Sequence, residues 1–133
     1  MDHITSSRVE NIILVGGTSV ISEALEEQLK AKGISITRKS GKNRFDTSLD
    51  IARSYFENAA TAVVANGMEF ADALAAAPYA AKMNAPIILV NQTRINQPIK
   101  DYLPMSKINR MVVVGGDAAI SEAVRNELKK LIE

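Results

Sequence analysis

Short apolar runs rich in β-branched residues alternate along this chain with stretches in which apolar residues recur every three to four positions. Such runs are typical of buried strands, and the longer spacing is typical of one face of a helix. The runs lie at residues 12–15, 34–37, 62–65, 86–90 and 111–114. Strands that alternate with helices run parallel, and a parallel sheet is covered on both faces. We therefore predict an α/β fold in three layers, with a mostly parallel sheet of about five strands flanked by helices.

Two positions decide where the predicted helices begin and end. Asp46 or Thr47 is expected to open the helix that follows the second strand, because both residue types favour helix N-termini. Residues 70–83 form an alanine-rich helical stretch with Pro78 in its middle. Proline removes a helix hydrogen bond and clashes with the preceding turn. We therefore predict two short helices there, the second with Pro78 in its first turn.

Composition sets bounds on the number of domains and on their chemistry. The chain has 133 residues, 47% hydrophobic and 23% charged, which is typical of one soluble domain. It has no cysteine, so it can form neither a disulfide nor a thiolate metal site. No segment approaches the roughly 18 consecutive apolar residues of a membrane-spanning helix, and we expect no membrane insertion. We expect residues 1–7 to be a disordered or added tail and residues 8–133 to form one domain.

The N-terminus and the net charge bear on export and on partners. Residues 1–7 have neither the basic region nor the apolar region of a signal peptide, so we expect the signal of an exported parent protein to lie outside this chain. The net charge is +1, so any attraction to a polyanion has to come from a local cluster of cations. We accordingly expect no nucleic-acid partner.

The chain contains an internal repeat. Val15-Gly16-Gly17 recurs 99 positions later as Val114-Gly115-Gly116. At the same offset the four residues at 21–24 recur at 120–123, and the Leu-Lys pair at 29–30 recurs at 128–129. A strand, a Gly-Gly turn and a helix stripe at one fixed offset indicate a repeat array. We predict a closing β–α piece of a preceding repeat at 8–40 and one complete repeat at 41–133.

Four motifs in order carry a resemblance to a known family. They are Gly41–Thr47, Val64–Gly67 with Phe70–Pro78, Ala85–Leu89, and the second Gly-Gly turn with Ile120-Ser121. This set resembles the cell-wall-binding repeat type 2 family, which is typified by clostridial S-layer and cell-wall proteins. The resemblance covers residues 41–132 as one repeat and 12–30 as the end of another. It implies the α/β fold predicted above, in a flavodoxin-like or Toprim-like arrangement.

The resemblance also implies a function and partners. Family members are exported proteins whose repeats usually come in threes about a pseudo-threefold axis and bind an anionic secondary wall polymer non-covalently. We therefore expect a non-catalytic anchoring module, secreted and located at the cell wall, that binds an anionic cell-wall polysaccharide and needs no cofactor. Because a lone repeat leaves the surfaces between repeats bare, we expect self-association, with a homotrimer favoured.

The densest cluster of cations lies in the loop before the second predicted helix. Lys39, Lys42 and Arg44 stand there beside small and polar residues. Spaced cationic donors and exposed backbone amides are what a polymer with repeated anionic groups needs. The alternative is a solvated loop in which Arg44 pairs with Asp46 or Asp72. Arg44 is the arginine of the family motif, and we expect it to shape the site more than to contact the ligand.

Three further candidates follow predicted strands at the carboxyl edge of the sheet, where open α/β folds place ligand crevices. They are Asp72 after the third strand, and Asn91 and Arg94 after the fourth. Asp72 has no catalytic partner, because the only histidine is His3 in the N-terminal tail and there is no cysteine. A helix cap or a salt bridge to Arg44 is an alternative role for Asp72. No spacing in the sequence indicates a metal site.

Three classes of function stay open at this point. The first is a wall-polymer-binding module, and the second is a structural oligomerisation unit of a surface array. The third is a small enzyme acting on a nucleotide or sugar phosphate, for which the Gly-Gly turns give limited support. Neither turn fits the Gly-x-Gly-x-x-Gly or P-loop motif. Each following helix also opens with serine and glutamate, and the carboxylate would repel a phosphate.

Overall fold

The computed structural model describes residues 8–133; the expected tail at 1–7, with His3, lies outside the described residues. Parallel strands alternate with helices, which confirms the predicted α/β class. The elements are β1 (Asn11–Val15), α2 (Glu23–Ala31), β2 (Ser35–Lys39), α3 (Arg44–Tyr55), β3 (Thr61–Asn66), α4 (Phe70–Lys82), β4 (Ile87–Val90), α5 (Gln97–Tyr102), the 3₁₀ turn η1 (Leu103–Met105), β5 (Arg110–Val113) and α6 (Glu122–Leu131). No helix among the described residues is both long and apolar enough to cross a membrane.

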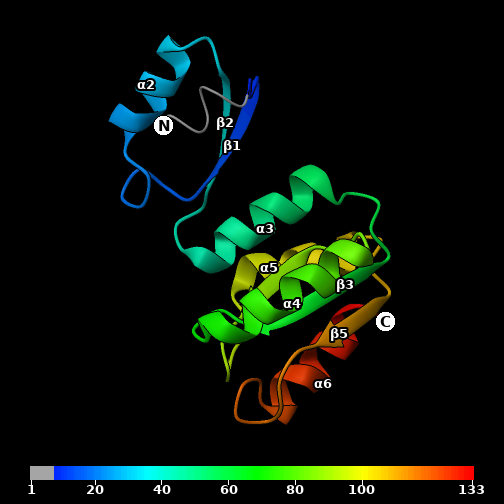
Figure 1. Ribbon diagram of the computed structural model, residues 1–133. Coiled ribbons are helices and arrows are strands. Elements are labelled where there is room, and N and C mark those ends of the chain that lie inside the picture. Colours follow the sequence, from blue (N-terminus) through cyan, green and yellow to red (C-terminus); the bar gives the residue numbers. More distant parts are fainter. Residues whose placement is uncertain (1–7) are drawn as a thin grey trace.

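The five strands form two sheets, so the prediction of one five-stranded sheet is wrong. β1 pairs with β2 in one sheet, and the other has the order β4-β3-β5 (Figure 1). β3 is the central strand of the second sheet, and its two edges are filled by β4 and by β5. β5 is the equivalent of β1 in the next repeat, so the place beside β3 that a single sheet would give to β1 is already occupied.

Helices cover both faces of the three-stranded sheet. On one face α3, α5 and α6 pack in a single core, and on the other α4 lies over the sheet (Figure 1). The alanines of α4, Ala76 and Ala80, are buried against Val63. Small side chains there let the helix lie close to the strands. The first core is larger, and its fully buried members include Leu49, Val64, Ile88, Ile99 and Leu128.

The β1–α2–β2 segment is a smaller unit with a core of its own. Leu14, Leu29 and Ile34 are its buried side chains, and α2 covers one face of the two strands. On the opposite face Ile13 and Val15 are 50% and 49% exposed. α3 lies between this unit and the three-stranded sheet (Figure 1). The two-stranded unit is therefore covered on one face only.

The start of α3 differs from the prediction. The helix begins at Arg44, and its N-cap is Asn43, whose side-chain oxygen accepts a hydrogen bond from the backbone N–H of Asp46 at 2.9 Å. Asp46 lies in the first turn, where its charge is favourable. The hydroxyl of Thr47 is engaged elsewhere, since it accepts from the backbone N–H of Gly41 and donates to the carbonyl of Asn43. Asn43 is the N-cap because its side-chain oxygen can reach the backbone N–H three residues later.

α4 is one continuous helix, so the predicted break at Pro78 is wrong. A proline at this position leaves the carbonyl of Leu74, four residues earlier, without its helix hydrogen bond. Both Pro78 and Leu74 lie on the exposed side of the helix, and Leu74 is 61% exposed. Water can bind the carbonyl there, so the helix continues through the proline.

Candidate functional site

A cavity of about 440 Å³ opens where the two units meet at the start of α3. Its walls are the first Gly-Gly turn, the loop that enters α3, the first two turns of that helix, and the end of β4. We call it the α3 cavity. It is lined by Val15, Gly16, Gly17, Ser19, Val20, Gly41, Lys42, Asn43, Arg44, Thr47, Ser48, Ile51 and Leu89.

A second, more polar hollow of about 530 Å³ adjoins the α3 cavity, and we call it the α5 groove. It is lined by Lys42, Asn43, Asp46, Arg94, Ile95, Asn96, Gln97 and Pro98. Lys42 and Asn43 line both hollows, so the two share a wall. We call the two hollows, together with the exposed loop at Lys42 that lies between them, the path.

The loop that separates the two hollows is held in a single shape. The backbone N–H of Gly41 donates to Thr47 Oγ1 at 3.0 Å, and Asn43 caps the helix between them. A Cβ added at Gly41 would lie 2.4 Å from the Cβ of Asp46 and 2.7 Å from its carbonyl carbon, so only glycine fits. The backbone is thus fixed on both sides of Lys42, whose own side chain extends into solvent.

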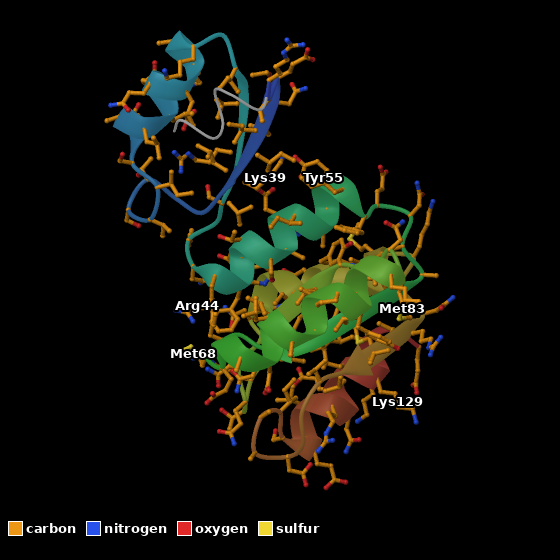
Figure 2. All side chains as sticks on the ribbon, in the orientation of Figure 1. Lys39, Arg44, Tyr55, Met68, Met83 and Lys129 are labelled. Atoms are coloured by element: carbon orange, nitrogen blue, oxygen red, sulfur yellow. The ribbon has the colours of Figure 1, made fainter. Side chains whose placement is uncertain are left out.

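Arg44 braces the start of α3 against β3. Its guanidinium donates from Nη1 to the carbonyl of Gly67 at 2.7 Å, and Figure 2 shows it at the first turn of α3, near Met68. In residues 8–133 Arg44 forms no ion pair with Asp46 or Asp72, the pairing considered as an alternative. The backbone carbonyl takes the role expected of a carboxylate, and the positive charge of Arg44 is not neutralised by a partner within this part of the chain.

Arg38 shapes the other wall of the α3 cavity, a role that the sequence prediction missed. Its guanidinium donates to the carbonyl of Gly16 at 2.8 Å and forms an ion pair with Glu26 at 2.8 Å. Both side chains are about 15% exposed. Hydrogen bonds from Lys30 and from Arg38 hold the pKa of Glu26 below its ordinary value of 4.5. Arg38 therefore ties the Gly-Gly turn to α2. The sequence could have indicated this role, because Arg38 stands two residues after Ile36 and so on the same face of the strand, which α2 covers.

Three of the six predicted site residues meet along the two hollows. Lys42 and Arg44 line the α3 cavity, and Lys42 and Arg94 line the α5 groove. Among the described residues none of the three takes part in an ion pair. Within residues 8–133 Asp46 is the one acidic residue that lines the two hollows, so the three cations leave the path with a net positive charge, which attracts an extended anion.

The other three predicted residues line neither hollow. Lys39 lies over the ring of Tyr55 with its ammonium 5.6 Å from the ring centre, at the opposite end of α3 from Arg44 (Figure 2). Asp72 lies beside the second Gly-Gly turn, where a Cβ added to Gly115 would be 3.3 Å from a carboxylate oxygen. Asn91 accepts a hydrogen bond from the backbone of Thr93 in a local turn.

The first Gly-Gly turn differs from a phosphate-binding loop in its surroundings. α2, which follows it, is capped by Ser22, whose hydroxyl accepts from the backbone of Leu25 at 3.2 Å. Glu23 and Glu26 occupy the first turn of this helix, and their charge disfavours a phosphate there. Within residues 8–133 no three acidic or histidine side chains are grouped so that they could hold a metal ion.

The family of the chain follows from comparison with known domains. Residues 38–125, about two-thirds of the chain, match the family Cell wall binding domain 2 (CWB2). The chain belongs to the CWB2 family. This confirms the resemblance drawn from the sequence motifs, and it identifies the chain as a cell wall binding module of a surface protein. The matched segment of the CWB2 domain begins at the end of β2 and includes the loop, α3 and the start of α5 that line the two hollows.

The relatives of this CWB2 domain are longer proteins, of which it matches one part. It is 41% identical over 121 residues to the N-acetylmuramoyl-L-alanine amidase LytC of Bacillus subtilis, covering 91% of this chain and 24% of LytC. It is 38% identical to the amidase enhancer of the same organism, covering 91% of this chain and 16% of that protein. Among solved structures it is similar to Cwp8 from Clostridium difficile, with a TM-score of 0.79 and 32% identity, over 92% of this chain and 20% of Cwp8. The chain thus spans a quarter or less of each of these relatives.

Proposed function

We propose that this CWB2 domain anchors its parent protein by holding an anionic wall polysaccharide along the path formed by the α3 cavity and the α5 groove. The observation that carries the proposal is the set of three unpaired cations on this path, with Lys42 at the junction of the two hollows. The binding is non-covalent and the module itself is non-catalytic. The amidase activity in the name of LytC belongs to that whole protein, of which this chain spans only 24%.

The three cations have different parts in the proposed binding. Lys42 is an exposed ammonium on a fixed backbone, so it meets an anionic group as a point charge at little cost in backbone entropy. Arg44 uses Nη1 to hold the carbonyl of Gly67, and because the residue also lines the cavity, its other N–H groups can donate to a ligand there. Arg94 lies beside Asn96 and Gln97, whose amides suit sugar hydroxyls. Lys39, Asp72 and Asn91 fall outside the site proposed here.

Salt and substitution test this proposal together. We expect the domain to co-sediment with purified Gram-positive walls at low salt, and to be released by high salt or by acid stripping of the anionic polymer. Lys42→Gln should weaken retention roughly three- to tenfold, because one ion pair to a polyanion contributes about 1 kcal/mol.

Lys129→Gln is the matched control for this experiment. It removes the same charge from an exposed lysine on α6, far from α3 in Figure 2. Equal losses from the two substitutions would mean that net charge, and not this path, governs retention. Undiminished binding to stripped walls would overturn the anionic polymer as the ligand.

A second role as a self-associating unit is favoured by the apolar surface of the domain. Ile13, Val15 and Val20 are exposed on the N-terminal unit, and Phe70 and Leu74 are 76% and 61% exposed on α4. Apolar groups that gather on a surface mark contacts with other molecules. We propose that the chain associates with copies of itself, with a homotrimer favoured, and that the copies bind the polymer together with an avidity that one copy lacks. Light scattering that finds only a 14.4-kDa monomer at all concentrations would contradict this.

A further inference from the structure

The structure contains the same β–α unit in two different surroundings. β5–α6 repeats β1–α2 at an offset of 99 residues, and α6 covers β5 as α2 covers β1. β5 pairs in parallel with β3, in a register that places Val112 beside Val63. Val112 and Val114 then pack with Val63 and the buried alanines under α4. The second copy of the unit therefore occupies the edge of β3. We call this edge, with the apolar surface under α4, the seat, and β5–α6 the seated unit.

The first copy of the unit lacks such a seat. Within residues 8–133 the only strand paired with β1 is β2, which leaves the other edge of β1 open. Ile13 and Val15 stand at the positions equivalent to Val112 and Val114, and both are about half exposed. The unit at β1–α2 thus presents to solvent the same strand edge and the same apolar face that β5–α6 buries.

We infer that β1 docks in parallel on the β3 edge of a second copy of this chain, in the place that this copy's own β5–α6 otherwise holds. Shifting the observed register by 99 positions sets Asn11 beside Thr61 and Leu14 beside Val64. Ile13 then lies beside Val63, under α4 of the second copy. The product is a four-stranded parallel sheet in the order β4-β3 of one chain followed by β1-β2 of the other. This inference specifies the surface for the self-association proposed above, and it brings Val15 and Val20, which line the α3 cavity, into contact with the second copy.

The contacts of β5–α6 at the β3 edge include backbone groups that both units possess, so either unit can make them. The buried side chain of Asn66 donates to the carbonyl of Ala119 at 2.7 Å. The backbone N–H of Val114 donates to the carbonyl of Val64 at 2.8 Å. The equivalent groups in the first unit are the carbonyl of Val20 and the N–H of Val15. Both are backbone groups, so the difference in side chains does not remove them.

The alternative arrangement, with β2 of a second copy on the outer edge of β5, is opposed by charge. Beside β1, the strand β2 places Arg38 against Glu26 of α2. The residue equivalent to Glu26 in α6 is Arg125, which pairs with Asp117. A second copy's Arg38 at this edge would face Arg125, and like charges in a partly buried contact are unfavourable. The open edge of β1 is therefore the one suited to association.

The test is a matched pair of substitutions at equivalent repeat positions in the full chain. Ile13→Asp damages the incoming unit, so we expect the association measured by light scattering to weaken roughly tenfold or more. Val112→Asp damages the resident unit and frees the β3 edge, so we expect association to strengthen. Ile13→Thr and Val112→Thr are milder versions of the same pair, and circular dichroism checks that each variant is folded.

Each pattern of results decides between the proposals. Opposite effects of the two substitutions support the exchange. Effects of the same sign, or no effect in a wild-type chain that associates, overturn the exchange but leave self-association in place. A monomeric wild type with an associating Val112 variant supports the exchange and overturns self-association of the native chain. Monomers throughout overturn both.

Discussion

The N-terminal unit at 11–39 and the unit built on the three-stranded sheet both contain the repeated β–α segment, but the apolar cores around it differ greatly in size. The smaller unit has three buried apolar side chains, one covered face and an ion pair between Arg38 and Glu26. The larger one has a core shared by α3, α5 and α6, and a second core under α4. Because stability follows buried apolar area, the two units should open at different free energies. The site lies where they meet, so its shape depends on the weaker of the two.

The largest effect is expected from removing the central leucine of each unit. Leu29 and Leu128 occupy equivalent repeat positions and are 2% and 1% exposed. Leu128→Ala should lower the free energy of global unfolding by about 2–5 kcal/mol. Leu29→Ala should remove a similar free energy from the N-terminal unit, which has a much smaller apolar core. We expect amides at 11–39 to exchange rapidly with solvent while those of β3 stay protected.

Hydrogen exchange followed by mass spectrometry measures this difference. Wild-type and both variants are compared peptide by peptide under native conditions. Equal loss of protection in β1 and β3 after Leu29→Ala would mean that the two units unfold as one body, and the comparison would then fail.

A smaller effect is expected from Asn66, whose side chain secures the seated β–α unit. Its amide donates to Ala119 and its oxygen accepts from the backbone N–H of Met68 at 2.8 Å. Asn66 is 4% exposed, so Asn66→Ala leaves buried backbone groups unpaired, at a cost of about 1–3 kcal/mol. Denaturant unfolding should report this loss. Protection of β1 amides should be unchanged, because no bond from Asn66 reaches the N-terminal unit.

The sequence predicted the elements better than their assembly. Apolar runs located all five strands, since each buried strand is a local pattern. The split into two sheets was missed because β1 and β5 are equivalent candidates for one edge of β3, and no local pattern decides which of them takes it. The break at Pro78 was wrong for another reason, since a helix tolerates proline where the freed carbonyl meets water. Both outcomes depend on tertiary surroundings.

The candidate site was likewise predicted where local sequence decides and missed where tertiary contacts decide. Lys42, Arg44 and Arg94 were found from charge and motif, and the fold brings them to adjoining hollows. Lys39 is close to Lys42 in sequence, yet it belongs to the other end of α3, because the strand carries it toward Tyr55. Arg38 was not among the predicted site residues. Its role depends on Glu26, twelve residues away on a helix, and such a contact is visible only when the strand and helix pack.

The smallest predicted effect is a loosening of the N-terminal unit by acid. Hydrogen bonds from Lys30 and Arg38 lower the pKa of Glu26 in the folded chain below its ordinary value of 4.5. The folded state therefore binds this proton less readily than the unfolded state. The resulting stabilisation is complete well above pH 4.5, declines as the pH falls below it, and is gone below the folded pKa. The equivalent residue of the seated unit is Arg125, so that unit has no carboxylate at this position.

Acid should thus act on the α2 side of the site before it acts on α6. Hydrogen exchange at pH 6 and pH 4, corrected for the intrinsic rate, should show a selective loss of protection in 11–39. Glu26→Gln is the control, because it removes both the ion pair and the titration: its N-terminal unit should be less protected at pH 6 and should respond less to acid. An unchanged acid response in that variant would assign the loosening to another carboxylate. Because Arg38 also holds the carbonyl of Gly16, the same acid step should relax the Gly-Gly wall of the α3 cavity.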